Sequence, residues 1–336
     1  MIRDTIQTLI QGISITKDTA AEAMSEIMSG ESTDAQIAAF ATALRMKGET
    51  SDEVAGMAQT MLKMAMKIEA PLDAIDTCGT GGDGAGTFNI STAAALVLAG
   101  AGITVAKHGN RAVSGSVGSA DVLEQLGVHI DLQPDGVERC FEAARIGFMF
   151  APVFHPAMRF AAGARREIGI RTIFNILGPL ANPARVKRQV IGVADPRIGE
   201  LVANVQQILE AKHIMVCHGI DGVDEISLDG PTRIWELKDA VIHSYLFEPS
   251  SVLLSPSPTS ALTVNAPEES ANRIVSVLNG ERGPSRDVVL ANSASGMIVG
   301  GEASNFTEAL ALSRESIDSG RAMTALKKLV EASNQS

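Results

Sequence analysis

Apolar residues recur three and four positions apart through residues 1–70, and this spacing predicts helices only. Three amphipathic segments are expected, at residues 18–30, 33–48 and 50–71. The predicted N-terminal caps are Asp18 or Thr19, Thr33 and the capping box Thr50-Ser-Asp-Glu53. The first two segments end at glycine and the third at Pro71, which cannot continue a helix. The start of the chain is therefore predicted to be a small helical domain.

From about residue 73 onward, short β-branched runs alternate with helical segments, which is the pattern of an α/β protein. The predicted strands are a run ending at Cys78, Ile103–Ala106, Val128–Ile130, Val190–Val193 and Ile214–Cys217. The predicted helices are Ala93–Ala99, Ser119–Leu126, Pro134–Ile146, Pro156–Gly169, Pro196–Glu210, Pro267–Asn279, Asp287–Val299 and Glu308–Ser319. A proline loop over residues 178–183 interrupts the alternation. The fold class expected is α/β, with a small all-helical N-terminal domain and a larger domain on a mostly parallel central sheet.

The composition narrows the class of protein. A chain of 336 residues with 45% hydrophobic and 20% charged residues is long enough for two globular domains. The net charge of −11 argues against a nucleic acid or an anionic membrane as partner. The three cysteines lack CxxC spacing, the N-terminus is unlike a signal peptide, and the longest apolar run, residues 93–106, is too short to span a bilayer. We expect a soluble, cytoplasmic protein.

A glycine-dense loop lies between the strand that ends at Cys78 and the helix predicted from Ala93. In such a loop the backbone N–H groups can approach a phosphate, and the helix N-terminus adds partial positive charge. The string from Gly79 to Gly84 matches Gly-x-Gly-x-x-Gly, but this match alone is weak, and an ordinary turn is the alternative. Asp83 would repel phosphate, so it indicates a ligand that brings hydroxyl groups or a metal ion.

A second glycine and serine loop, residues 107–119, follows the predicted strand Ile103–Ala106 and carries Lys107 and Arg111. It leads into a capped helix at Ser119. A helix N-terminus stabilises an anion by only about 0.3–1 kcal/mol, so a doubly anionic ligand needs added cationic groups. Two such loops close together indicate one ligand with two anionic ends.

Two further groups of charged residues are candidates for chemistry. Asp224 and Glu225 follow the predicted strand Ile214–Cys217, where α/β sheets bind ligands, and adjacent carboxylates suit Mg²⁺. A solvated acidic turn is the alternative. Arg165, in an Arg-Arg-Glu run, is suited to holding a carboxylate, although an ion pair with Glu167 would leave the same pattern. No order of His, Asp and Ser suggests a catalytic triad.

Eight stretches together resemble the anthranilate phosphoribosyltransferase family. They occur in that family's order and span most of the chain, whereas several of them singly are shared with pyrimidine nucleoside phosphorylases. The stretches are Asp76-Thr-Cys-Gly-Thr-Gly-Gly-Asp-Gly, Phe88-Asn-Ile-Ser-Thr92, Lys107-His-Gly-Asn-Arg111, Gly118-Ser-Ala-Asp-Val-Leu-Glu124, His155-Pro-Ala-Met158, Arg165-Arg-Glu, Arg171-Thr-Ile-Phe-Asn-Ile-Leu-Gly-Pro-Leu180 and Asp221-Gly-Val-Asp-Glu-Ile226.

The resemblance implies transfer of the phosphoribosyl group of phosphoribosyl pyrophosphate (PRPP) to the amine of anthranilate, a step of tryptophan biosynthesis. It implies a helical domain over residues 1–70, joined by a returning segment near 165–187, and an α/β domain over 73–336, with the site at the hinge. It further implies Mg²⁺, with two ions expected, a homodimer built through the N-terminal helices, and association with anthranilate synthase.

The resemblance also assigns residues by position. The PRPP contacts would be Gly79, Gly82, Asp83, Thr87, Asn89, Ile90, Ser91, Thr92, Lys107, His108, Gly109, Asn110, Arg111, Ala112, Val113, Ser114, Gly115 and Ser119. The metal contacts would be Ser91, Asp224 and Glu225, and the anthranilate contacts Gly79, Asn110 and Arg165. Lys107, Arg165 and Asn110 are the expected catalytic residues. The chain departs from the family at Gly115, usually a serine, and at Gly163-Ala164, usually Pro-Val.

Two other functions remain open from the sequence. A nucleoside phosphorylase of the same fold would bind phosphate and a pyrimidine base, and it would not need Asp224 and Glu225. A non-catalytic paralogue that binds nucleic acid would need a basic face, which the net charge of −11 opposes.

Overall fold

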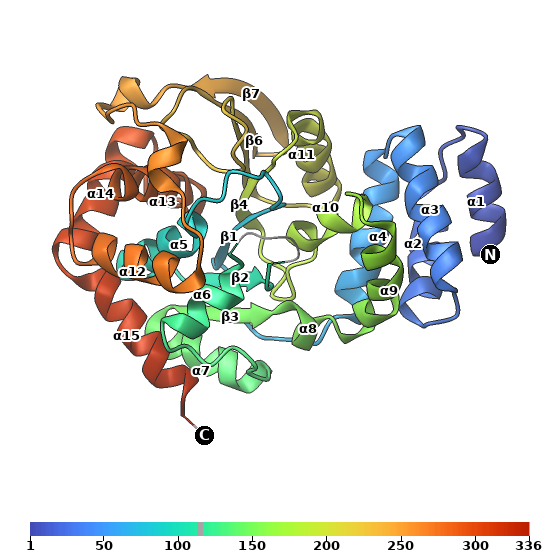
Figure 1. The fold of residues 1–336 in the computed structure, drawn as a ribbon, viewed down its shortest axis with the longest axis horizontal. Coiled ribbons are helices and arrows are strands. Elements are labelled where there is room, and N and C mark those ends of the chain that lie inside the picture. The colour runs from blue at the N-terminus through green and yellow to red at the C-terminus, as the bar shows by residue number, and fades with distance from the viewer. Residues whose placement is uncertain (113–116, 336) are drawn as a thin grey trace.

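The computed structural model describes residues 1–112 and 117–335. Within these residues the N-terminal part is a bundle of four helices, α1 (Ile2–Ile10), α2 (Lys17–Met28), α3 (Asp34–Lys47) and α4 (Ser51–Met64). The bundle lies beside the larger part of the molecule, with α1 farthest from the sheet (Figure 1). The prediction of helices only in this region is confirmed, and α1 is a further helix that the apolar spacing did not single out.

Local capping signals explain where these helices begin. The predicted caps at Thr33 and Thr50 are both present, and each forms a capping box with the residue three positions later, although a box was predicted only at Thr50. The prediction for α2 was wrong by two or three residues. Its cap is Thr16 rather than Asp18 or Thr19, because the Thr16 hydroxyl accepts the backbone N–H of Thr19 at 3.1 Å.

The end of α4 also differs from the prediction, since the helix stops at Met64 and not at Pro71. Ala65 has extended backbone angles, φ −67° and ψ 153°. The next amide, the N–H of Met66, donates to the carbonyl of Phe154 at 2.9 Å. This long-range hydrogen bond replaces the helical one, so a tertiary contact ends the helix.

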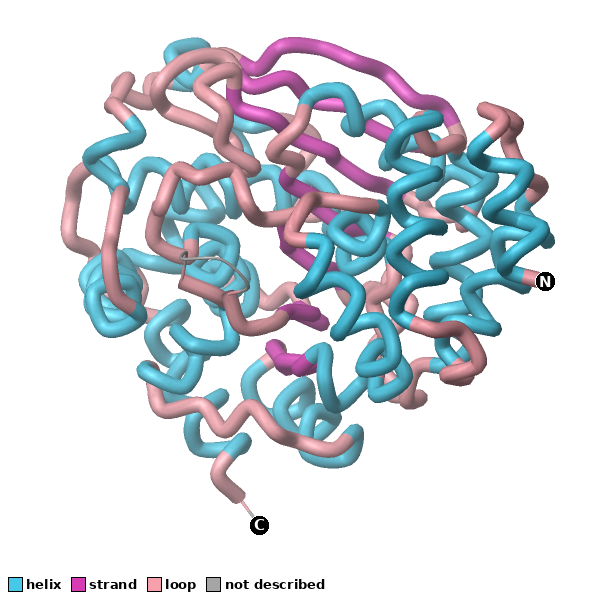
Figure 2. Tube along the Cα trace, turned by 45° about the vertical axis from the view of Figure 1, so that its right-hand side comes forward, coloured by secondary structure: helices cyan, strands magenta, loops and turns pink. Residues whose placement is uncertain are grey.

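The described part of the chain contains one seven-stranded sheet with the order β3-β2-β1-β4-β5-β6-β7. The first five strands run parallel, and the last two are antiparallel, which confirms a mostly parallel sheet. Figure 2 shows the strands side by side through the middle of the molecule. Their bounds are β1 Ile75–Gly79, β2 Val105–Gly109, β3 Ile146–Phe150, β4 Arg188–Gly192, β5 His213–Gly219, β6 Thr232–Lys238 and β7 Val241–Phe247.

The predicted strand Val128–Ile130 does not form. The N–H of Val128 donates back to the carbonyl of Leu123 at 2.9 Å, and the N–H of His129 donates to the hydroxyl of Ser333 at 3.1 Å. These bonds use the amides that a strand would need for pairing. The sequence analysis missed β3, β6 and β7.

The remaining helices largely follow the predicted order. They are α5 Ile90–Gly100, α6 Ser119–Gln125, α7 Pro134–Ala144, α8 Ala151–Phe154, α9 Arg159–Ile168, α10 Ile173–Leu180, α11 Gly199–Ile208, α12 Pro267–Leu278, α13 Pro284–Gly300, α14 Phe306–Asp318 and α15 Arg321–Ser333. The predicted loop at 178–183 begins as the last turn of α10, with Pro179 inside the helix. No helix of the described residues is long and apolar enough to cross a membrane.

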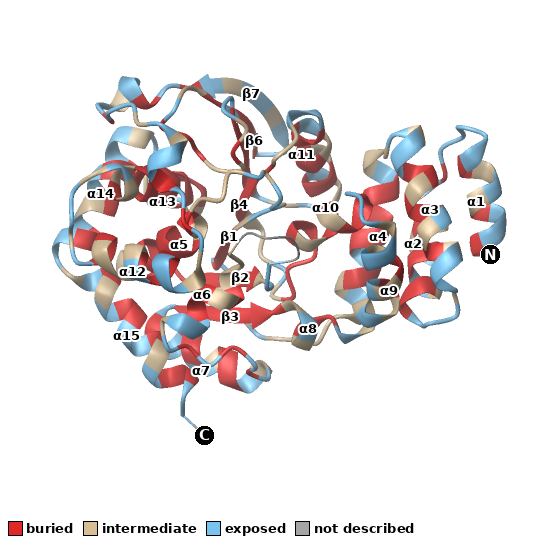
Figure 3. Cartoon of the chain, in the orientation of Figure 1, coloured by how far each residue is buried: buried red, intermediate tan, exposed pale blue. Residues whose placement is uncertain are grey.

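The two faces of the sheet belong to two hydrophobic cores. Alternate residues of β5 show this, since Ile214 and Val216 pack with the bundle and α11, whereas Met215 and Cys217 pack with α5 and α13. Figure 3 shows both layers of buried residues, one on each side of the strands. α9 packs against α2 and α3, and α10 packs against α3 and α4, so residues 159–180 lie with the bundle.

Candidate active site

The sheet order creates a crevice at the carboxyl ends of β1 and β4. From β1 the chain continues outward through β2 and β3 on one side, and from β4 through β5 on the other. Open α/β sheets bind their ligands where the strand order reverses in this way. Gly79 and Gly192 end the two strands, and a Cβ at either would collide with Asp224. The two glycines therefore leave space for the loop that follows β5 to lie across the crevice.

The predicted phosphate-type loop follows β1 and connects it to α5. Its glycines at 81, 82, 84 and 86 all have positive φ angles, between 63° and 74°. The N–H of Gly81 donates to the Asp224 carboxylate at 2.7 Å, and the N–H of Ala85 donates to Asp83 at 3.1 Å. Backbone amides that hold carboxylate oxygens here have the geometry to hold phosphate oxygens.

Asn89 stands at the cap position at the start of α5 without capping the helix through its side chain, which accepts no helix N–H. Its amide instead donates to the carbonyl of Val117 at 2.9 Å, and its amide oxygen accepts the Ser270 hydroxyl at 2.9 Å. The N–H of Ser91 donates to Glu225 at 3.2 Å. Asn89 thus ties α5 to the second loop and to α12, and an acidic residue occupies the helix N-terminus.

Lys107 lies beneath both loops and is only 2% exposed. Its ammonium donates to the carbonyl of Thr77 at 2.6 Å and to the Ser91 hydroxyl at 3.4 Å. Burial lowers the pKa of Lys107, and the nearby carboxylates of Asp76 and Glu225 oppose this shift. The structure therefore places a cationic side chain at the floor of the crevice.

Asp76 was not among the predicted site residues. It is fully buried, and its carboxylate accepts hydrogen bonds from the amides of Asn182 at 2.8 Å and Gln189 at 3.1 Å. Burial raises the pKa of Asp76, and Lys107 opposes the shift. These two amide partners lie more than a hundred residues away in sequence, so only the place of Asp76 before the glycine loop could have indicated a role.

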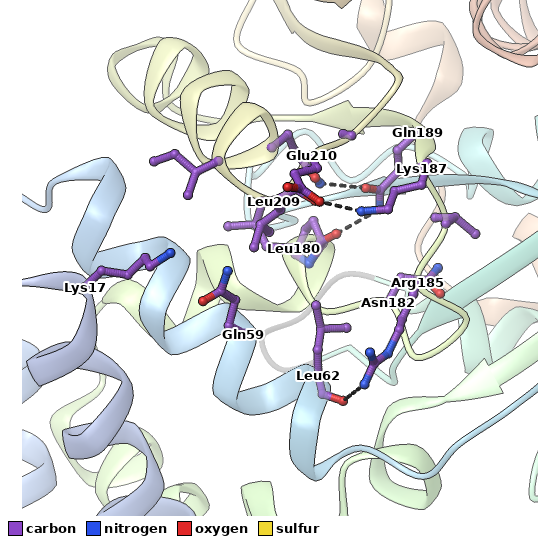
Figure 4. Close-up of a pocket in the computed structure, with 15 residues that line it drawn as sticks. Lys17, Gln59, Leu62, Leu180, Asn182, Arg185, Lys187, Gln189, Leu209 and Glu210 are labelled. Atoms are coloured by element: carbon purple, nitrogen blue, oxygen red, sulfur yellow. Dashed lines mark hydrogen bonds between the residues drawn. The ribbon is translucent and has the colours of Figure 1, made fainter. Parts of the chain in front are cut away.

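The hydrogen bonds of Asp76 lead through Gln189 to a cavity at the opposite end of the strands (Figure 4). Gln206 donates to Gln189 at 2.9 Å, and both line a cavity of about 440 Å³ between α4, the end of α10 and the end of α11. Lys187 and Arg185, also in its wall, donate to the carbonyls of Leu209 and Leu62. This cavity lies at the amino ends of β4 and β5, away from the predicted site.

Three carboxylates meet at the open side of the crevice. The N–H of Asp224 donates to Asp83 at 3.4 Å, and Glu225 is the next residue. Burial raises the pKa of Asp224 and of Glu225, and repulsion from neighbouring carboxylates raises both further. A divalent cation would relieve this repulsion, and the oxygen donors are those that Mg²⁺ prefers. Within residues 1–112 and 117–335, no three His, Cys, Asp or Glu side chains are grouped so that they could hold a metal ion by themselves.

The second loop contributes groups of different kinds. The His108 ring lies 5.1 Å from the His155 ring, and burial, with a smaller effect of His155, lowers the pKa of His108 to about 3. Asn110 is exposed, and its carbonyl accepts the Ser119 hydroxyl at 3.4 Å. The Arg111 guanidinium bonds to two acidic residues of α6, not to the crevice. The predicted contacts Val113, Ser114 and Gly115 lie outside the described residues.

Arg165 lies in the last turn of α9, on the bundle side of the crevice. Its guanidinium lies 5.8 Å from the centre of the Phe174 ring, and burial lowers its pKa. In the described part of the chain it forms no ion pair or side-chain hydrogen bond, so the alternative pairing with Glu167 is absent there. A half-buried, unpaired arginine can hold an anionic group bidentately. The sequence analysis missed Arg171, which reaches the glycine loop from the same side.

Comparisons with known proteins agree with this geometry. Residues 72–323 match the glycosyl transferase family a/b domain, and residues 3–65 match the helical bundle domain of that family. Anthranilate phosphoribosyltransferase of Thermomicrobium roseum is 51% identical over 99% of this chain and 97% of its own length. A crystal structure of the same enzyme from Thermus thermophilus has a TM-score of 0.93 at 39% identity, covering 99% of this chain and all of that one.

The Saccharomyces cerevisiae enzyme has been solved with ligands. Its complex with PRPP and Mg has a TM-score of 0.91 at 26% identity and covers 99% of this chain and 97% of the yeast chain. The same enzyme in complex with 4-fluoroanthranilate has a TM-score of 0.88, with equal identity and coverage.

Proposed function

This chain belongs to the anthranilate phosphoribosyltransferase family, and from that membership we propose that it transfers the phosphoribosyl group of PRPP to the amine of anthranilate. The products are phosphoribosylanthranilate and pyrophosphate, and the chain is a pentosyl transferase of tryptophan biosynthesis. The observation that carries this function is the meeting of the glycine loop, Lys107 and the Asp224–Glu225 pair at one crevice.

The glycine loop and the floor of the crevice would hold PRPP. Displacement of pyrophosphate from a sugar carbon passes through a cation-like ribosyl transition state, as at other glycosidic centres. Lys107 supplies positive charge beneath the loops, and the loop amides donate to the pyrophosphate oxygens. Asn89 ties the first loop to the second through the carbonyl of Val117, and Ser119 braces the second loop internally through the carbonyl of Asn110. Catalysis is then mainly positioning and electrostatic stabilisation.

The magnesium site would be built from Asp224, Glu225 and the Ser91 hydroxyl, with Asp83 beside them. When bound, Mg²⁺ supplies neutralisation of charge on the leaving pyrophosphate. The raised pKa values of Asp224 and Glu225 support a site that gains from a cation. We propose two ions, because three neighbouring carboxylates exceed what one Mg²⁺ usually takes from a protein.

Anthranilate would be held at the bundle side of the crevice. The Arg165 guanidinium binds its carboxylate, and Asn110 and the backbone at Gly79 orient its amine toward the sugar carbon. The aniline nitrogen is weakly basic, so it needs little deprotonation before attack. This agrees with a neutral His108, whose pKa of about 3 makes it a poor base at neutral pH.

The proposed activity has a direct assay. With PRPP and Mg²⁺, the chain should consume anthranilate, followed as loss of its fluorescence, and release pyrophosphate. With phosphate and a pyrimidine nucleoside it should release no free base. Phosphorolysis without anthranilate consumption would instead establish the nucleoside phosphorylase alternative, and activity in neither assay, with binding to nucleic acid, would establish the non-catalytic one.

We also propose the domain division at residues 1–70 and 73–336, with the segment near 165–187 returning to the bundle. The packing of α9 and α10 on α2, α3 and α4 supports it. A cytoplasmic location and association with anthranilate synthase stay predictions.

We predict a homodimer formed through the bundle. Ile10, Ile13 and Met46 are 65%, 52% and 83% exposed, and the Lys47 ammonium donates to the Ser14 hydroxyl at 3.3 Å, so the end of α3 lies beside the link between α1 and α2 that carries Ile13. Ile13→Glu with Met46→Glu should convert a dimer in sedimentation into a monomer, because charges would be buried at the interface.

The matched control is Leu253→Glu, at a 92% exposed position of the α/β part, which should leave the dimer intact. A parent chain that sediments only as a monomer at micromolar concentration would contradict the dimer. An unchanged dimer in the double variant would place the interface elsewhere.

A further inference from the structure

Arg171 connects the bundle side of the molecule to the glycine loop. It lies in the short link between α9 and α10 and is exposed, yet its guanidinium donates to two loop carbonyls, those of Gly81 and Thr80. The N–H of Gly81 in turn donates to the Asp224 carboxylate at 2.7 Å. The same residue of the loop is therefore held from two directions by oppositely charged side chains.

The neighbouring glycine shows that the loop is shaped around this arginine. Gly82 has a φ of 69°, and a Cβ at this position would collide with the Arg171 guanidinium. A side chain at 82 would thus be strained and would also displace Arg171. The atom in this close approach is the same Nη1 that donates to the carbonyl of Gly81, so the guanidinium lies directly against the loop backbone.

Arg171 lies between two parts of the candidate site, Arg165 on α9 and the glycine loop. Arg165 lies in the last turn of α9, six residues before Arg171, and α9 and α10 pack on the bundle. The glycine loop extends from β1 of the sheet. A movement of the bundle segment against the sheet would therefore move Arg165 and Arg171 together and would pull on Gly81.

We propose that Arg171 is a positioning residue that couples the PRPP-binding loop to the anthranilate-binding end of α9. This inference rests on the proposed function, because it takes the two substrate sites from it. With the link present, each substrate should favour the arrangement that suits the other, so each increases the affinity for the other by the same factor. With the link removed, the two sites should act independently.

The test compares Arg171→Met with Arg166→Met. Arg166 is an exposed arginine at the end of α9 with no side-chain hydrogen bond or ion pair among the described residues, so it controls for the loss of one charge. Initial rates over a grid of PRPP and anthranilate concentrations at saturating Mg²⁺ give the coupling factor between the substrates. In Arg171→Met this factor should fall to about one, and KM for PRPP should rise about tenfold, as expected for the loss of hydrogen bonds to a charged donor.

Arg171→Lys separates positioning from bulk charge. A lysine keeps the charge but has no planar fork to reach two carbonyls, so it should recover only part of the PRPP affinity and of the coupling. The melting temperature should match that of the parent in all three variants, because Arg171 is exposed and contributes little to either core. A merely structural role would lower the melting temperature and leave the coupling factor unchanged.

The outcomes distinguish this inference from the proposed function. If the parent transfers phosphoribosyl groups to anthranilate and Arg171→Met keeps the parental coupling factor, Arg171 has no positioning role. If the parent itself fails to consume anthranilate, the proposed function is wrong, and calorimetry of PRPP–Mg²⁺ binding to the parent and Arg171→Met still tests the contact with the loop. Equal PRPP affinity in that experiment overturns the inference.

Discussion

Replacing both Asp224 and Glu225 with alanine should remove most of the turnover, at least about a hundredfold, while the fold stays intact. The expected loss of turnover is this large because preorganised charge stabilisation is lost, and removing a single donor already costs about 10²–10³ in kcat. The amides of Gly81 and Ser91 lose their carboxylate acceptors. Since burial and mutual repulsion already raise the pKa values of both carboxyls, removing them also relieves strain, and the melting temperature should change little.

The measurement is kcat over a range of Mg²⁺ concentrations, with thermal melting of each variant. Glu268→Ala with Glu269→Ala, an exposed adjacent pair on α12, is the matched control and should keep the parental dependence on Mg²⁺. A double variant at 224 and 225 that melts like the parent and keeps near-parental turnover at limiting Mg²⁺ would show that the pair is only an acidic turn. The nucleoside phosphorylase alternative would then regain support.

Arg165→Ala should raise KM for anthranilate about 10- to 150-fold, and it should leave KM for PRPP nearly unchanged. The range corresponds to about 1.5–3 kcal/mol for a hydrogen bond to a charged group. The structure favours this separation, because the guanidinium lies over Phe174 on the bundle side and contacts neither the glycine loop nor Lys107 in the described residues. Steady-state kinetics with each substrate varied in turn measures both constants.

The control for this prediction is Arg166→Ala, which removes the adjacent exposed arginine of the same helix. It should leave both constants within about twofold of the parent, since surface substitutions away from a site usually have small effects. A rise in KM for PRPP with no change for anthranilate would assign Arg165 to the other substrate.

Features set by neighbouring residues could be predicted from the sequence, and features set by distant ones could not. The capping boxes at Thr33 and Thr50 depend on residues three positions apart, and both formed. The end of α4 and the absence of a strand at Val128–Ile130 depend on Phe154 and Ser333, far along the chain. Composition and spacing carry no signal for such contacts. The hairpin of β6 and β7 is instead a local feature, and it was missed because its two-residue turn, Asp239-Ala240, lacks the Asn-Gly or Asp-Gly signal of such turns.

The same division applies to the candidate site. The motifs indicated which loops would meet, because the carboxyl ends of parallel strands share one edge of a sheet. They did not indicate the partners of each side chain. The ligand contact of Arg111 stays a prediction, and the pairing of its guanidinium with Asp121 and Glu124 was not foreseen. Asp76 and Arg171 make long-range contacts that no local pattern encodes.

Gly79 and Gly192 determine how this crevice tolerates mutation over evolutionary time. Neither has a functional group, yet a methyl group at either position would occupy the space of Asp224. An alanine there would displace the loop that carries Asp224, a proposed metal ligand, without altering any charged residue. In a survey of random substitutions, changes at Gly79 and Gly192 should therefore abolish activity as changes at the acidic residues do. A lineage that kept every acidic residue could still lose the activity through a substitution at either glycine.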